Sequence, residues 1–247
     1  MDALHVAHPQ FAVRSTGCSD YVCALTDLDR ETADRFLSRY EHLRNVGLGI
    51  WHWGLLIDGA LASVLSFGTT CFSHTRGLIS SVACRYNARL VQLCRGATAS
   101  WAPKNTPSKT IGLSLRRIAD RFGPTIVVAY ADPAFNEIGT IYQASNAIFT
   151  GWTNPKGQAN YVINGRRLSG WVVRKKFGTR SRERLLEIDK TLVVEPLNPK
   201  LRYILIAGPP NIRRKIRKEL STLRCSYPKR REHRVYPMCM GGCGQDL

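Results

Sequence analysis

Long apolar runs are absent from this 247-residue chain. No stretch reaches the roughly 18 consecutive apolar residues that a transmembrane helix needs. The N-terminus, from Met1 to His5, also lacks the basic-then-apolar layout of a secretory signal. We therefore expect a soluble, cytoplasmic protein without a membrane partner.

Two nucleotide-binding motifs are missing as well. The chain contains no Gly-x-x-x-x-Gly-Lys-[Ser/Thr] loop, which disfavours hydrolysis of nucleoside triphosphates. No expected strand leads into a Gly-x-Gly cofactor loop with an acidic ribose ligand, because Gly47-Leu48-Gly49 precedes a strand instead. This absence weakens any assignment to the usual methyltransferases.

The eight cysteines show no framework spacing, so in a cytoplasmic protein we expect them to be mostly reduced. The tightest group is Cys239 and Cys243, with Cys225 and His233 upstream. A zinc knuckle typically has two close Cys-x-x-Cys pairs, whereas this tail has one loose pair. Metal binding is therefore the minority interpretation, and the sequence leaves the need for a metal open.

Acidic residues are scarce: 18 Asp and Glu stand against 36 Lys and Arg, for a net charge of +18. Residues 151–247 hold 22 basic against 7 acidic residues, whereas residues 1–150 hold 14 against 11. A basic segment on a nearly neutral body is typical of a protein that binds a polyanion. A solvated basic face or an anionic lipid would also suit this charge, but no amphipathic lipid anchor accompanies it, so we favour nucleic acid.

Helical and strand patterns alternate along the chain, without internal repeats. Residues 1–25 have no clear period and are expected to form an irregular lead-in. Asp58-Gly59 and Asn164-Gly165 mark two hairpins. The expected helices cover residues 26–44, 108–122, 138–149, 181–188 and 211–223, and the expected strands cover residues 48–57, 60–67, 90–95, 125–129 and 201–207.

This alternation predicts an α/β (mixed α+β) fold: a curved, mixed and partly antiparallel sheet with helices on both faces. We expect one domain over residues 26–225, with its basic part beginning at about residue 151. The remaining residues 226–247 are expected to form a flexible basic, Gly-ending tail.

The segment from Tyr130 to Gly151 is the centre of this organisation. Asp132-Pro133 ends the expected strand, because proline lacks an N–H donor. The acid then faces an expected helix carrying Tyr142, Gln143 and Asn146. Ligand sites in α/β sheets gather at such strand ends. A helix-capping role for Asp132 is an equally good local explanation.

A second candidate site is an anion cradle between a strand and a helix. A strand ending at Arg95, a loop through Lys104 and Asn105, and Ser108 as the helix N-cap would supply N–H groups and the positive end of a helix dipole. The pyrophosphate of an acyl-CoA would suit this place. An ordinary capped helix with a solvated lysine is the structural alternative.

The tetrapeptide Asp132-Pro133-Ala134-Phe135 is reminiscent of the Asp-Pro-Pro-[Tyr/Phe] loop of amino-methyltransferases. In that loop an acid and a carbonyl accept hydrogen bonds from an exocyclic amine, and the aromatic ring stacks on a flipped base. His42, on the first expected helix, is a candidate acid or base near neutral pH, although a lone helical histidine is more often structural.

A longer pattern resembles a known family. The residues are Tyr130-Ala-Asp-Pro133, Gly139-Thr-Ile-Tyr-Gln-Ala-Ser-Asn146, Thr150-Gly151 and the loop Pro103-Lys-Asn-Thr-Pro-Ser108. Together they are similar to the Mom proteins of Mu-like phages, over roughly residues 30 to 225. The resemblance implies a GNAT-like acyltransferase fold and an enzyme that attaches a methylcarbamoyl group to N6 of adenine in phage DNA, which shields the DNA from host restriction.

The resemblance also implies roles for individual residues. Asp132 and Tyr142 match the family's active-site acid and tyrosine, and Arg95 and Ser108 match positions tied to the acetyl-CoA-like cradle. His42 falls where the family usually has a tyrosine in a His-Tyr-Leu pattern; Glu41-His42-Leu43 departs from it and leaves the role of the first helix open.

We expect double-stranded DNA with a flipped adenine to be the substrate. The pocket would be formed by Tyr130, Pro133, Phe135, Gln143 and Asn146. An acetyl transfer alone does not give a methylcarbamoyl product. The donor can be acetyl-CoA with an added nitrogen, or an activated glycyl group such as an aminoacyl-tRNA with a later rearrangement, and a metal-assisted route is also open. A non-catalytic nucleic-acid-binding protein, an N-acetyltransferase for another amine and an adenine methyltransferase are the alternatives.

Overall fold

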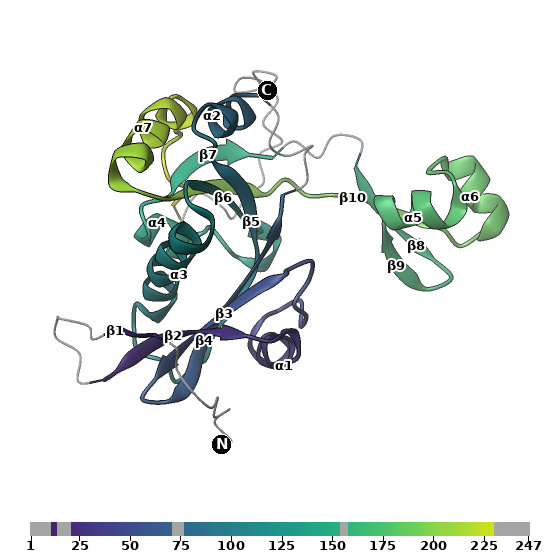
Figure 1. Ribbon diagram of the computed structural model, residues 1–247. Coiled ribbons are helices and arrows are strands. Elements are labelled where there is room, and N and C mark those ends of the chain that lie inside the picture. The colour runs from purple at the N-terminus through teal and green to yellow at the C-terminus, as the bar shows by residue number, and fades with distance from the viewer. Residues whose placement is uncertain (1–10, 14–20, 71–76, 154–157, 230–247) are drawn as a thin grey trace.

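A computed structural model describes residues 11–13, 21–70, 77–153 and 158–229. One large sheet organises the chain, in the strand order β1-β2-β3-β4-β5-β6-β11-β7 (Figure 1). Strands β5 and β6 run parallel, and the other neighbours in this sheet run antiparallel. The strands are β1 (Phe11–Val13), β2 (Cys23–Leu28), β3 (Trp51–Ile57), β4 (Ala60–Thr69), β5 (Arg89–Thr98), β6 (Thr125–Ala131), β7 (Ile148–Trp152) and β11 (Leu201–Ala207).

Helices cover both faces of the sheet. On one face, α3 (Thr106–Phe122) packs Ile111 and Ile118 into the largest apolar cluster, beside α4 (Thr140–Ala144). On the other, α1 (Arg30–Tyr40) packs against β3 and β4. This second face also carries α2 (Leu78–Arg85) and α7 (Pro210–Leu220) over β6, β7 and β11. The predicted mixed α/β fold, with a partly antiparallel sheet flanked by helices, is confirmed.

Residues 159–196 form a second, smaller unit, which we call the arm. Its antiparallel sheet has the order β10-β8-β9 and is covered by two helices. Figure 1 shows the arm projecting from the side of the large sheet. Its elements are β8 (Ala159–Ile163), β9 (Arg166–Ser169), α5 (Gly170–Phe177), α6 (Arg182–Ile188) and β10 (Val193–Pro196).

Both hairpins predicted from Asx-Gly pairs are present, joining β3 to β4 and β8 to β9. At each turn the two residues have positive φ, which Asp, Asn and Gly adopt most readily. The expected strands at residues 90–95, 125–129 and 201–207 and the basic helix near residues 211–223 are also found.

Three predicted boundaries are wrong. Residues 23–28 form strand β2 rather than lead-in and helix, since their backbone pairs antiparallel with β3 in the sheet. The first helix therefore begins at Arg30, and His42 lies after its end rather than on it. The expected helix over residues 138–149 is only α4, because Ile148 and Phe149 belong to β7 and pair with β11.

Candidate functional site

The parallel pair β5 and β6 separates partway along its length. Their pairing runs from Arg89 opposite Thr125 to Leu93 opposite Ala129. Beyond that point β5 continues beside β4, with an irregular register at Cys94, and β6 continues beside β11. The centre of the sheet therefore opens where both strands approach their carboxyl ends, which is where α/β sheets typically hold ligands.

Asp132 directly follows β6 at this opening. Its Oδ1 accepts a hydrogen bond from the Ala134 N–H at 3.1 Å, which caps a 3-10 turn, η2 (Pro133–Phe135). Its Oδ2 lies 3.2 Å from Lys200 Nζ, and its side chain is only 16% exposed. Asp132 thus follows the end of β6, as predicted, and its side chain caps η2 rather than the helix α4 that comes after it.

The Asp132–Lys200 pair follows from strand register. Leu201 pairs with Ala131 in the antiparallel ladder between β11 and β6. Lys200, which precedes Leu201, therefore stands opposite Asp132, which follows Ala131. Sequence reasoning missed Lys200. In the sequence, the only indication of its role was its position immediately before an expected strand. That position becomes informative once the pairing of the strand is known.

His42 contacts the turn that follows Asp132, and so lies at the same site. The imidazole stacks on the Phe135 ring, with centroids 4.2 Å apart, and its Nδ1 lies 3.6 Å from Glu137 Oε1. Glu137 in turn accepts from the Asp132 N–H at 3.4 Å. Phe135 is 51% exposed, so an aromatic surface lies open beside the mostly buried Asp132. Glu137 is a second site residue that the sequence reasoning did not identify.

Tyr142 stands behind this turn on α4. Its ring packs on Tyr203 of β11 at 5.2 Å between centroids. Burial, with smaller contributions from the Glu137 charge and Tyr203, raises the pKa of the Tyr142 hydroxyl above its usual value of 10.0. Tyr142 is therefore a proton donor, not a phenolate, throughout the neutral range.

The loop before α4 approaches these tyrosines closely. Gly139 has φ of +70°, and a Cβ atom there would collide with the Tyr203 ring and touch Tyr142. The Tyr203 hydroxyl donates to the Ile138 carbonyl at 2.5 Å, and the Gln143 amide donates to the same carbonyl at 3.0 Å. Gln143, predicted to bind substrate, thus braces the turn.

The other two predicted substrate-binding residues lie on either side of this region. Tyr130 is half-buried near the end of β6, one residue before Ala131. Asn146 is exposed after α4 with φ of +55°, and its carbonyl accepts from Arg217 of α7 at 2.8 Å.

The residues of the predicted anion cradle come from the start of α3 and from β5. Lys104 and Asn105 are exposed at the start of α3, where Asn105 is the N-cap in a left-handed conformation and makes no side-chain capping bond. The prediction of Ser108 as N-cap is wrong: it lies inside the first turn, and its hydroxyl donates to the Asn105 carbonyl. Proline at position 107 starts this helix earlier, since proline is favoured in a first turn.

Arg95 of β5 lies beside the loop that follows α1. Its guanidinium carbon would be 3.2 Å from a Cβ placed on Gly47, and its Nη1 donates to the Cys94 carbonyl at 2.7 Å. Within the described chain, Arg95 Nε is buried without a hydrogen-bond partner. The loop before β3 also accepts two hydrogen bonds from Arg30, through the carbonyls of Gly47 and Gly49.

Cys94, at the irregular point of β5, does not have the properties of a nucleophile. Burial raises the pKa of its thiol to about 11, against an ordinary 9.0, although the Arg95 charge acts in the opposite direction. Its Sγ points to the Gln92 carbonyl at 3.6 Å.

The residues that the structure describes contain no group of three or more His, Cys, Asp or Glu side chains able to hold a metal ion. The Cys239 and Cys243 tail lies outside the described residues. None of the described helices has the length and apolar character needed to span a bilayer.

Comparison with known proteins gives one family. The Mom protein family matches residues 23–229 of the chain. No curated protein matches it. Among solved structures, a polyamine N-acetyltransferase from Drosophila melanogaster is similar at 8% identity, with a TM-score of 0.40, covering 74% of this chain and 99% of that one.

Two further solved structures are similar at comparably low sequence identity and TM-score. The ribosomal-protein-S5-alanine acetyltransferase from Vibrio fischeri matches at 8% identity and a TM-score of 0.40, over 79% of this chain and 96% of that one. An N-acyl amino acid synthase from uncultured soil microbes matches at 12% identity and a TM-score of 0.39, over 83% of this chain and 99% of that one. Similarities this distant support no conclusion about activity.

Proposed function

Because the chain belongs to the Mom protein family, we propose that it is an acyltransferase-like enzyme that modifies adenine in DNA at N6. The product would be N6-methylcarbamoyl adenine, which protects phage DNA from host restriction, and the protein would act in the cytoplasm of the host cell. The observation that carries this proposal is the position of Asp132. A mostly buried carboxylate ends the central strand where the sheet opens, with an exposed aromatic pair beside it.

This arrangement supports recognition of a flipped base. An unstacked base needs a flat apolar surface and hydrogen-bond acceptors for its exocyclic amine. Phe135 and His42 supply the aromatic surface, and Asp132 supplies the acceptor. Lys200 Nζ, 3.2 Å from Asp132 Oδ2, places a positive charge beside this acceptor before substrate arrives.

In the mechanism that we propose, Asp132 accepts a hydrogen bond or the proton from the N6 amine as a new bond forms at that nitrogen. The N6 lone pair is delocalised into the ring, so proximity alone is insufficient and an acceptor is needed. Tyr142 remains protonated and provides the complementary donor for charge that develops on an oxygen. His42, next to Glu137, would help to hold the base in place.

The residues present fit an activated acyl donor. After Leu93, β5 no longer pairs with β6. The amide groups of a donor can pair with an unpaired strand edge of this kind. The first turn of α3 has no side-chain cap, and Lys104 is exposed beside it, which together suit a phosphate group. Attack of N6 on the donor's activated carbonyl would release the CoA thiol or the tRNA hydroxyl and leave an N6–acyl bond. Because N6 is bonded to a methylene carbon in the proposed product, a rearrangement must follow. A glycyl group from an aminoacyl-tRNA carries all the atoms that the product needs, whereas acetyl-CoA also needs a source of nitrogen.

Substitution of Asp132 by alanine tests this assignment. We expect Asp132→Ala to abolish adenine modification while leaving affinity for a DNA duplex within about twofold of the parent protein, because phosphate contacts dominate affinity. Modification would be measured by nucleoside mass spectrometry, and binding by fluorescence anisotropy. Asp120→Ala, at an exposed position of α3, is the matched control and should retain modification.

Two outcomes would contradict the role of Asp132. One is full modification by the Asp132→Ala protein. The other is loss of DNA binding by a variant whose circular dichroism spectrum is unchanged.

A further inference from the structure

The arm has a hydrophobic core separate from that of the large sheet. Buried side chains from its strands and both helices form a cluster of their own, consisting of Tyr161, Ile163, Val173, Leu185 and Leu192. The arm is thus a packed structural unit inserted between β7 and β11, not an extended loop.

Positive charge is concentrated on the outside of this unit. Residues 159–196 contain nine Lys and Arg against four Asp and Glu. Two of the four acids are occupied within the arm: Glu195 pairs with Arg167 at 2.6 Å, and Asp189 accepts from Asn164 and Thr191. Most of the basic side chains therefore face solvent without an acid to balance them.

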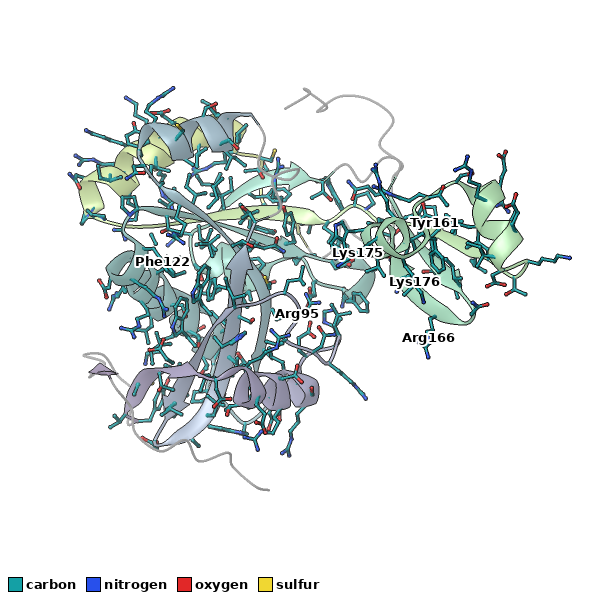
Figure 2. All side chains as sticks on the ribbon, turned by 45° about the vertical axis from the view of Figure 1, so that its right-hand side comes forward. Arg95, Phe122, Tyr161, Arg166, Lys175 and Lys176 are labelled. Atoms are coloured by element: carbon teal, nitrogen blue, oxygen red, sulfur yellow. The ribbon has the colours of Figure 1, made fainter. Side chains whose placement is uncertain are left out.

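Helix α5 presents the densest part of this charge. Val173 is fully buried, whereas Arg174, Lys175 and Lys176 are consecutive and exposed. Trp171 is 68% exposed, and Lys175 Nζ lies 5.3 Å from the centre of its ring. Figure 2 shows Lys175 and Lys176 on this helix, with Arg166 on the adjacent hairpin.

The arm joins the large sheet at the candidate site. Two hydrogen bonds close its neck: Thr153 N–H donates to the Lys200 carbonyl at 2.7 Å, and Lys200 N–H donates to Thr153 Oγ1 at 2.8 Å. The same Lys200 pairs with Asp132 through its ammonium group. A polymer held on the arm is therefore held by a unit anchored beside the acid that receives the acceptor base.

We propose that the arm binds the phosphate backbone of the DNA duplex whose adenine enters the Asp132 site, with α5 as its principal contact. This inference rests on the proposed function for the choice of polymer. Arg174, Lys175 and Lys176 point in three directions, about 100° apart, around the exposed part of α5. An α-helix fits the width of the major groove, where cations that spread in this way can reach the phosphates of both bordering strands. A tryptophan beside those cations adds stacking surface for a base exposed by flipping.

A matched pair of charge variants of the full chain tests the proposal. Arg174→Gln/Lys175→Gln/Lys176→Gln removes three cations from α5. Arg213→Gln/Arg214→Gln/Lys215→Gln removes three equally exposed cations from α7, on the large sheet. Binding of a fluorescent adenine-containing duplex would be measured by anisotropy over a series of salt concentrations.

We expect the α5 variant to lose about tenfold or more in affinity and to reduce the slope of log K against log salt by about two to three, since each lost phosphate contact contributes about 0.9. The α7 variant should change the slope by less than about one. Binding is measured without any reaction, so failure of this inference is distinguishable from failure of the proposed chemistry.

Three outcomes would overturn the proposal: an α5 variant that binds DNA as the parent does, an α7 variant that loses as much as the α5 variant, or an α5 variant that loses tRNA binding while keeping DNA binding. Should the triple variant lose its fold, Lys175→Gln and Lys176→Gln are made singly. Each should reduce the slope by about one, and no change in either would equally contradict the role of the arm.

Discussion

Gly139 shows how one residue sets the geometry behind the site. Its positive φ is strained for any L side chain, and a methyl group there would collide with the Tyr203 ring. Gly139→Ala should therefore lower the free energy of unfolding by about 2–4 kcal/mol, from backbone strain and overpacking together. Denaturant titration measures this loss.

Gly165 is the matched control in the arm hairpin. It has the same φ of +70°, but nothing lies within 4 Å of the place where its Cβ would be. Gly165→Ala should lose only the strain contribution, about 1 kcal/mol. Equal losses in the two variants would show that the Tyr203 contact is unimportant.

Tyr142 gives a pH-dependent prediction. Because its pKa is raised in the folded protein, the folded state holds a proton that the unfolded chain releases above pH 10.0. The resulting stabilisation is complete below the unfolded pKa and is lost as pH rises above it. Unfolding free energies measured across this range should fall less steeply for Tyr142→Phe than for the parent.

The same variant separates packing from chemistry. Phenylalanine preserves the ring contact with Tyr203 and removes only the hydroxyl, so Tyr142→Phe should fold normally and modify adenine about a hundredfold more slowly. A folded variant with parental activity would exclude Tyr142 as the donor.

Cys94 is predicted to be unreactive in the folded protein. With a pKa of about 11 its thiolate fraction is small at neutral pH, and the thiolate is the species that alkylates. Iodoacetamide at pH 8 followed by peptide mass spectrometry should label the exposed Cys84 well before Cys94. Preferential labelling of Cys94 would contradict the buried position and would make it a candidate nucleophile.

Residue types predicted part of the local structure around the candidate site. The proline after Asp132 located the end of a strand. Phe135 was proposed as a substrate-binding residue from the local motif Asp132-Pro133-Ala134-Phe135. That His42 stacks on Phe135 could not be predicted, because the contact joins residues far apart in the chain. Lys200 and Glu137 were missed for the same reason: their roles depend on strand register and on the fold of one turn.

At the scale of elements, Asp27 of β2 connects the sheet to α3 through a hydrogen bond and an ion pair. Asp27 Oδ1 accepts from Trp53 Nε1 at 2.8 Å, and Asp27 Oδ2 pairs with Arg117 of α3. Trp53 is only 1% exposed, so its N–H has no ready access to water.

Asp27→Ala should consequently cost about 1–3 kcal/mol of unfolding free energy, because it leaves a buried donor unsatisfied. Asp27→Asn keeps an acceptor and loses only the charge, so it should cost less. Chemical denaturation of both variants measures the difference, and an alanine variant as stable as the parent would show that this connection is unimportant.

Element boundaries were the least predictable part of the fold. Residues 26–28 continue the apolar spacing of α1, yet they pair with β3, because sheet pairing outweighs a local helical period. Ile148 and Phe149 likewise fit a helical spacing and are instead in β7. Asx-Gly hairpins were predicted correctly because their turn geometry is decided by the two residues themselves.

At the scale of the whole molecule, the chain combines a nearly neutral sheet with basic attachments. The sheet positions Asp132, His42 and Tyr142, and the arm and α7 carry much of the positive charge. The charge imbalance was evident in the sequence. Its division between two separate surfaces was not, because it depends on how β8, β9 and β10 pair.

The most direct test of the central claim is the mass of the adenine nucleoside in DNA from cells that express this chain. The account predicts deoxyadenosine heavier by one methylcarbamoyl group, in DNA from cells with the parent protein and not from cells with Asp132→Ala. A gain of one methyl group would instead indicate a methyltransferase. Unmodified deoxyadenosine from cells with abundant, folded protein would contradict the proposed function and leave a DNA-binding protein or a transferase with another acceptor.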